Sequence, residues 1–211
     1  MTYPILSPKL AASAAKHLAS NDPALAPVIA EFGLCNIQPH QNYYQELVDS
    51  IVSQQLSIKA AASIMQRFID LFNGSFPSPE AILQKSAEDF RGAGLSYAKA
   101  NYIRDLAERI LDGRLKFDHL DQLNNDEIVK ELTAVKGVGE WTADMFMMFC
   151  MGRPDVLATG DLGIKNGIRS LYKLKDVPTP EQITKIASKN SWHPYETVAC
   201  WYIWRSLRNK D

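Results

Sequence analysis

The chain has 211 residues, of which 46% are hydrophobic, and its formal net charge at pH 7 is −1. This length and apolar content are enough for one large domain or two closely packed lobes. The charge argues against a protein that coats nucleic acid broadly, no apolar run reaches the roughly 18 residues of a membrane span, and the first residues lack the pattern of a secretory signal.

Helix signals run through nearly the whole chain. Apolar residues recur at helical spacing, as in Tyr44, Leu47, Val48 and Ile51, and no segment alternates with the period of a strand. The expected helices are, in order, 8–20, a short one from Pro23 towards Phe32, 43–52, 57–72, two starting after Ser78 and Ser86, 97–111, one from Asn125 or Asp126, and one after the capping box Thr179–Gln182. These patterns predict an all-α fold.

The three cysteines, Cys35, Cys150 and Cys200, lie far apart in apolar contexts. Such residues are typical of reduced core thiols in an intracellular protein. The sequence contains no CxxC pair, which argues against zinc. Three scattered cysteines are also too few for a four-cysteine iron–sulfur cluster.

A tight glycine turn, Gly137-Val138-Gly139, separates two helical patterns. Glycines at 137 and 139 allow positive φ angles and a close approach to the backbone. The amides from Glu140 onward begin a helix, where they lack intrahelical partners and favour an anion such as phosphate. On glycine spacing alone, an ordinary turn between helices is the simpler interpretation.

One acidic residue, Asp161, follows this turn after about twenty residues, in the run Ala158-Thr159-Gly160-Asp161. An ionised carboxylate can stabilise developing positive charge. An aspartate before a helical pattern is also a common N-cap. From the residues alone, the cap is the simpler interpretation.

The segment from Leu132 has the pattern Leu-x-x-Val-Lys-Gly-Val-Gly-x-Trp-Thr-Ala, and Gly-Asp-x-Gly follows from Gly160. Together they closely resemble the helix-hairpin-helix and catalytic-aspartate region of HhH-GPD superfamily DNA glycosylases, in the alkylpurine (3-methyladenine, type II) branch. The resemblance covers roughly residues 40–208 and includes Gln54-Gln55-Leu56-Ser57 and the Trp-rich segment 192–204. It departs at Glu196, where relatives often have arginine, which puts a minor ion pair in doubt.

By this resemblance, residues 1–211 form a single two-lobed helical glycosylase module. Lobe one would run from about residue 40 to 150 and include the hairpin at 132–150. Lobe two would combine residues 1–39 with 151–211. Asp161 would then lie in an active-site cleft between the lobes.

The resemblance also implies roles for particular residues. Asp161 would be catalytic, stabilising oxocarbenium character on the sugar. Gln55 and Leu56 would form the wedge that fills the hole left by a flipped base, with a buried hydrogen-bonding glutamine and a core leucine as the alternative. Contacts to DNA phosphate would come from Gly137, Gly139, Thr142 and Lys165. No cofactor would be required, and a monovalent cation would bind the main-chain carbonyls of Thr133, Val135 and Gly137.

Aromatic side chains would form the base pocket, because an aromatic face both stacks on a base and binds a cation. Trp141 and Trp204 match positions that line the pocket in relatives, and Trp201 and Tyr44 are further candidates. Met145 stands where some relatives have tyrosine, which leaves the selectivity of the pocket open. Each of these tryptophans, considered alone, is more typical of a core residue.

Basic residues suggest a local nucleic-acid contact. Lys165, Arg169 and Lys173 are spaced four apart, with Lys175 following, and so form one stripe of a helix. The tail adds Arg205, Arg208 and Lys210. A solvated helix face explains such a stripe as well as a phosphate contact does.

The implied function is hydrolysis of the N-glycosidic bond of alkylated purines such as 3-methyladenine and 7-methylguanine, leaving an abasic site in base excision repair. Trp141 stands where lyase-competent relatives carry lysine, so we expect a monofunctional enzyme. The expected partner is double-stranded DNA containing an alkylated purine, bound by a monomer that is cytoplasmic in a bacterium and nuclear in a eukaryote. The alternatives are a non-catalytic helix-hairpin-helix DNA-binding protein and a bifunctional lyase for oxidised bases.

Overall fold

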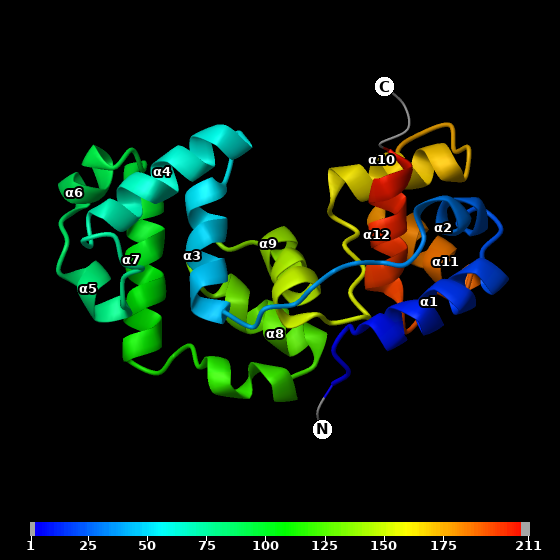
Figure 1. Cartoon of the computed structure of the whole chain (residues 1–211), viewed down its shortest axis with the longest axis horizontal. Coiled ribbons are helices and arrows are strands. Elements are labelled where there is room, and N and C mark those ends of the chain that lie inside the picture. The colour runs from blue at the N-terminus through cyan, green and yellow to red at the C-terminus, as the bar shows by residue number, and fades with distance from the viewer. Residues whose placement is uncertain (1–2, 208–211) are drawn as a thin grey trace. The chain divides into compact units, whose positions relative to one another are not determined.

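The computed structural model describes residues 3–207. Over this range the chain forms helices joined by loops, without a β-strand (Figure 1). The predicted all-α class is therefore confirmed. Among the described residues, none of the helices combines the length and apolar character that a membrane span requires.

The helices follow one another along the chain with short connections. They are α1 (Pro8–Asn21), α2 (Ala26–Phe32), α3 (Tyr43–Ser53), α4 (Ile58–Asp70), α5 (Pro79–Leu83), α6 (Ala87–Gly92), α7 (Tyr97–Leu111), the 3₁₀ helix η1 (Phe117–Gln122), α8 (Asn125–Thr133), α9 (Glu140–Met145), the π-helix η2 (Phe146–Met151), α10 (Leu162–Leu171), α11 (Pro180–Lys189) and α12 (Glu196–Ser206).

Side-chain caps set most of the helix starts. The predicted capping box at Thr179 is present, and Ser86, after which a helix is expected, forms a second one. In each box the cap side chain accepts the amide of the residue three positions on, and the side chain of that residue accepts the amide of the cap. The expectation that Pro23 opens a helix is wrong. The carboxylate of buried Asp22 accepts the amides of Ala24 and Leu25, which forms a turn, and α2 begins only at Ala26.

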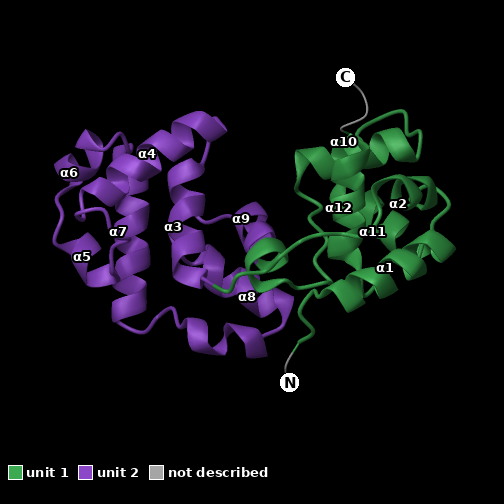
Figure 2. Ribbon diagram, in the orientation of Figure 1, with its two compact units in different colours: residues 1–41, 147–211 green, residues 42–146 purple. Residues whose placement is uncertain are grey.

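The chain divides into two compact units (Figure 2). Unit 1 comprises Met1–Gln41 and Met147–Asp211, and unit 2 comprises Asn42–Phe146. In unit 2, α7 packs against α3, α5 and α6, while α3 also contacts α4 and α8 contacts α9. The apolar faces of α3 and α7 form the centre of this core, and each fully buried Leu or Ile contributes roughly 1.5–3 kcal/mol.

In unit 1, the core is built around α12, which is buried at every residue from Thr197 to Ile203 and contacts α1, α2 and α10. Asp22 adds a polar connection inside this core. Its Oδ2 accepts hydrogen bonds from Trp192 Nε1, at 2.7 Å, and from the Tyr172 hydroxyl. Burial and the neighbouring carboxylate raise the pKa of the Tyr172 hydroxyl far above its ordinary value, so it remains a donor.

Candidate functional site

The glycine turn between α8 and α9 uses its two glycines differently. Gly137 has φ +81°, and a Cβ there would lie 2.1 Å from Cδ2 of the Tyr102 ring, so both conformation and packing require glycine. The expectation of a positive φ at Gly139 is wrong: it is the N-cap of α9 with φ −100° and ψ 174°, which any residue adopts. A Cβ on Gly139 would meet no protein atom within 4 Å. The exposed Gly139 backbone is thus open to approach from outside.

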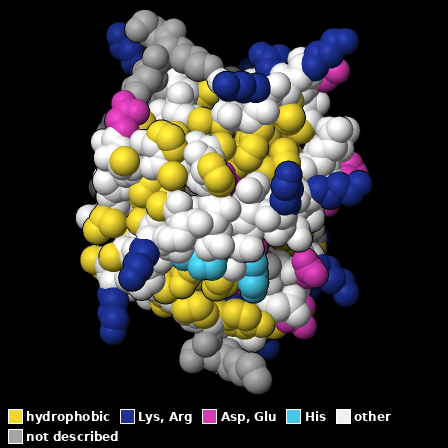
Figure 3. Space-filling view, turned by 90° about the vertical axis from the view of Figure 1, so that its right-hand side faces the viewer, with side chains coloured by type: hydrophobic (Ala, Val, Ile, Leu, Met, Phe, Trp, Pro, Cys, Tyr) yellow, Lys and Arg dark blue, Asp and Glu magenta, His cyan; other side chains and the backbone are white. Residues whose placement is uncertain are grey.

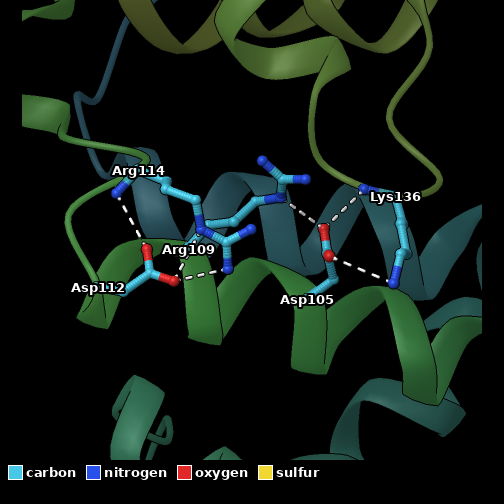
Figure 4. A network of polar contacts seen from close by, with 5 residues as sticks. All are labelled: Asp105, Arg109, Asp112, Arg114 and Lys136. Carbon is cyan, nitrogen blue, oxygen red and sulfur yellow. Dashed lines mark hydrogen bonds and ion pairs between the residues drawn. The ribbon is translucent and has the colours of Figure 1, made fainter.

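A buried aspartate on α7 anchors this turn (Figure 4). Asp105 Oδ2 accepts the Lys136 amide at 2.9 Å and Arg109 Nε at 2.8 Å, and Lys136 Nζ lies 3.6 Å from Oδ1. Burial by itself would raise the pKa of the Asp105 carboxyl. These hydrogen bonds and the nearby positive charges outweigh burial and hold its pKa below the ordinary value. The ionised carboxylate therefore fixes the backbone immediately before Gly137.

The loop between α3 and α4 is bound to the same turn. Lys99 Nζ donates to the carbonyls of Val52, at 2.8 Å, and Gln54, at 2.7 Å, at the end of α3. Partial burial lowers the pKa of Lys99. Gln54 Nε2 in turn donates to the Gly137 carbonyl at 2.8 Å. The loop and the glycine turn therefore form one connected surface of unit 2.

The two wedge candidates, Gln55 and Leu56, lie in the middle of this loop, between the end of α3 at Ser53 and the start of α4 at Ile58. Gln55 has φ +57° and is exposed, and Leu56 is 37% exposed. Neither residue belongs to the core, so the alternative of a buried glutamine and a core leucine does not describe them. A left-handed backbone at a residue other than glycine costs free energy and is often found at functional sites.

Asp161 caps α10 in unit 1. Its Oδ1 accepts the Ile164 amide at 2.8 Å and Trp204 Nε1 at 2.9 Å. The capping alternative for Asp161 is therefore correct as a structural description, and it does not exclude a chemical role.

Two glycines of α10 allow α12 to approach closely enough for this contact. A Cβ on Gly163 would lie 2.9 Å from Cδ1 of Trp204, and a Cβ on Gly167 would lie 2.3 Å from Cγ2 of Ile203. Phe149 stacks on the Trp204 ring with 5.8 Å between centroids and 28° between planes. The indole N–H is thus directed at Asp161 by packing on both sides.

Trp141, in the first turn of α9, is half exposed at 51%. Met145 lies four residues further on the same helix and is half-buried. A large aromatic side chain left in solvent beside an accessible backbone is a common feature of binding surfaces. Of the aromatic pocket candidates, Trp141 is the one whose ring is presented outward.

The other two aromatic candidates are engaged in packing. Trp201 is buried, and the Arg205 guanidinium lies over its ring at 4.6 Å from the centroid, so a cation already covers that face. Tyr44 packs edge-on against Phe76 with 5.6 Å between centroids. Burial, with the charge of Glu80, raises the pKa of the Tyr44 hydroxyl well above its ordinary value.

The phosphate-contact candidates differ in their exposure. Thr142 is buried, whereas Gly137 and Gly139 are exposed and Lys165 is half-buried. Arg169, in the last turn of α10, is exposed, and so are Lys173 and Lys175. The expected helical stripe does not reach Lys173, because α10 ends at Leu171 and Lys173 has φ +52°. Of the tail residues, Arg205 is half-buried over Trp201, whereas Arg208 and Lys210 lie outside the described residues.

The carbonyls expected to bind a cation belong to the same turn as Gly137. The Val135 carbonyl accepts the Val138 amide at 3.1 Å, and the Gly137 carbonyl accepts Gln54 Nε2. A carbonyl oxygen has two lone pairs, so each retains capacity for a further contact. Neutral oxygen donors of this kind fit a hard monovalent cation.

Sequence reasoning missed three elements of this site: the Trp204 hydrogen bond to Asp161, the Lys99 contacts that fix the α3–α4 loop, and the Asp105 anchor. Only the first had a local signal. Gly163 and Gly167 are four residues apart on one helix, a spacing that is typical of close helix packing.

Known proteins resemble this chain over most of its length. A family model described as HhH-GPD superfamily base excision DNA repair protein matches residues 48–192. DNA-3-methyladenine glycosylase 1 of Schizosaccharomyces pombe is 36% identical over 170 residues, which cover 80% of this chain and 74% of that protein.

Two solved structures extend the likeness over almost the whole chain. A DNA-3-methyladenine glycosidase from Bacillus halodurans has 39% identity and a TM-score of 0.84, covering 99% of this chain and 94% of that one. The Schizosaccharomyces pombe 3-methyladenine DNA glycosylase Mag1, in complex with abasic DNA, has 33% identity and a TM-score of 0.79, covering 94% and 98%. With its hairpin, its capped aspartate and these matches, the chain belongs to the HhH-GPD superfamily of base excision DNA repair proteins.

Proposed function

We propose that this protein is a monofunctional DNA glycosylase that flips alkylated purines out of duplex DNA and hydrolyses their N-glycosidic bond. The observation that carries the proposal is the Asp161 carboxylate, which the Ile164 amide and the Trp204 indole hold by one oxygen at the start of α10. A DNA-binding module has no use for such a fixed acid near phosphates, which it would repel.

Asp161 acts on the sugar. Cleavage of the glycosidic bond builds oxocarbenium character, and a preorganised carboxylate stabilises that charge without reorganising. Water is the nucleophile, and an abasic site remains. Trp141 occupies the position at which the family resemblance places the lysine of a lyase, so no amine is available there to form a Schiff base with the sugar.

Unit 2 holds the DNA. The accessible Gly139 backbone and the amides at the start of α9 bind a phosphate. The carbonyls of Thr133, Val135 and Gly137 would hold a monovalent cation, which would supply positive charge for a phosphate. Gln55 and Leu56 fill the space left by the flipped base. Lys165, on α10 of unit 1, contributes a further phosphate contact, and the protein acts as a monomer.

The exposed ring of Trp141 supports a preference for cationic lesions. N3- and N7-alkylated purines carry positive charge, and an indole face attracts a cation while it stacks on the base. The substrates of this proposal are therefore 3-methyladenine and 7-methylguanine. Met145, on the same side of α9, lines the pocket beside Trp141.

The test is to incubate the protein with alkylated duplex DNA and identify the released bases by chromatography, comparing wild type with Asp161→Asn. Wild type should release 3-methyladenine and 7-methylguanine. The variant should release none, yet bind duplex DNA as tightly or more tightly, because a negative charge near phosphate is lost. Excision at the wild-type rate by Asp161→Asn would remove Asp161 from the mechanism, and tight binding without release by wild type would favour the non-catalytic alternative.

A further inference from the structure

Ile58 is the most exposed large hydrophobic side chain of the described residues, at 91%. It is the first residue of α4 and follows the N-cap Ser57. Every residue from Gln55 to Lys59 is exposed, so Ile58 lies in the middle of an outward-facing segment, which we call the α4 tip. A single exposed isoleucine needs no explanation, but the backbone that carries Ile58 is held in place by hydrogen bonds.

The backbone of the α4 tip is fixed by contacts on both of its sides. On the α3 side, Lys99 Nζ binds the carbonyls of Val52 and Gln54. On the α4 side, Ser57 Oγ accepts the Ala60 amide at 3.3 Å. Ile58 is therefore presented on a backbone that is already ordered, which spares a binding partner the cost of ordering it.

The α4 tip is continuous with the DNA-contacting turn of the proposed function. Gln54 Nε2 donates to the Gly137 carbonyl at 2.8 Å. Two exposed lysines accompany this surface, Lys59 on the tip and Lys136 in the turn. Basic side chains around an apolar projection complement a DNA strand, whose phosphates lie outside and whose bases present apolar faces where they are unstacked.

We propose that Ile58 enters the duplex beside the vacated base position and packs against the neighbouring bases, as a second apolar contact next to Gln55 and Leu56. This inference rests on the DNA-binding part of the proposed function. It adds a residue that neither the hairpin nor the wedge motif includes. Partial unstacking of a base step by an inserted apolar side chain is an established means of distorting DNA.

The experiment uses the full chain and a duplex with a tetrahydrofuran abasic-site analogue, and measures Kd at one fixed salt concentration. Ile58→Ser should weaken binding by about tenfold, since most of the burial free energy of one isoleucine is lost. Ile58→Leu should restore wild-type affinity. Leu111→Ser is the matched control, because Leu111 ends α7 in the same unit and is 43% exposed; its Kd should stay within about twofold of wild type.

Stability is a separate readout. Because Ile58 contacts almost nothing within the protein, the thermal unfolding midpoint of Ile58→Ser should equal that of wild type. A Kd for Ile58→Ser equal to that of wild type would overturn the inference. Tighter binding by Ile58→Lys would also overturn it, because it would place the tip against phosphates. So would a wild-type dimer that Ile58→Ser converts to monomers, since the tip would then be covered by a second copy.

Base release separates this inference from the proposed function. If wild type releases alkylated purines and Ile58→Ser binds as well as wild type, only the role of Ile58 is excluded. If wild type releases no base but Ile58→Ser loses affinity for the abasic analogue, the catalytic proposal fails and the contact by Ile58 stands.

Discussion

The proposed catalytic residue, Asp161, accepts a side-chain hydrogen bond from Trp204. The indole N–H and the Ile164 amide meet the same carboxylate oxygen, while Phe149 and Gly163 confine the indole ring. Trp204 therefore orients the carboxylate, in addition to the base-stacking role proposed for it.

Replacing Trp204 by phenylalanine separates orientation from stacking, since it keeps an aromatic ring and removes the N–H. If Trp204 orients Asp161, Trp204→Phe should slow base release by about 10- to 100-fold, the value of a hydrogen bond to a charged group. The loss should be equal on 7-methylguanine and hypoxanthine, and the Kd for DNA should not change. Single-turnover rates and Kd values measure this directly. A loss confined to 7-methylguanine would assign Trp204 to stacking alone.

At the scale of elements, the hairpin between α8 and α9 depends on its two glycines for different reasons. A Cβ on Gly137 would clash with the Tyr102 ring, whereas a Cβ on Gly139 would meet no protein atom within 4 Å. Gly137 is therefore needed for the turn to fold, and Gly139 leaves the backbone accessible to a DNA phosphate.

Alanine substitutions test this division of roles. Gly137→Ala should lower the free energy of unfolding by roughly 1–3 kcal/mol or more, through strain at positive φ and the clash with Tyr102. Gly139→Ala should unfold at the wild-type midpoint but bind damaged and undamaged duplexes equally weakly, because its Cβ holds the phosphate away from the backbone. Thermal melts and binding isotherms for both variants measure these effects. Normal DNA binding by Gly139→Ala would place the phosphate contact elsewhere.

At the scale of the whole molecule, charge provides little general attraction to DNA. The formal net charge is −1, and on the face shown in Figure 3, Lys and Arg side chains are dispersed among apolar and acidic ones. Binding must then depend on a few local contacts, and selection must depend on the chemistry of the lesion.

Lesion charge should decide which bases are released. A cationic purine is already a good leaving group, whereas neutral hypoxanthine needs a proton donor. The Ile164 amide and the Trp204 indole donate to Asp161 Oδ1, and an amide or an indole does not give up its proton at neutral pH. We therefore expect wild type to release 7-methylguanine faster than hypoxanthine under single-turnover conditions. In Trp141→Leu this preference should fall by about tenfold, because the cation–π and stacking contacts of the indole are lost. Equal wild-type rates on the two lesions would refute selection by charge.

The sequence by itself determined the features that depend on neighbouring residues. Helix periodicity and caps such as Ser78 and Thr179 are local signals, because a capping side chain reaches only two or three residues along the chain. Spacing in the glycine turn and before Asp161 likewise sufficed to recognise the family. The predicted start of the second helix at Pro23 was wrong because the carboxylate of buried Asp22 accepts the amides of Ala24 and Leu25 and holds them in a turn.

Only the tertiary structure decided which side chains meet across long stretches of chain and which remain in solvent. The bond from Trp204 to Asp161 spans 43 residues, and the bond from Gln54 to Gly137 spans 83. Exposure distinguished the two pocket tryptophans: Trp141 is half exposed, whereas Trp201 is buried beneath Arg205. The exposure of Ile58 likewise became evident only in the structure. Burial and long-range hydrogen bonds depend on how helices distant in sequence pack together, and the residue types at these positions do not encode that packing locally.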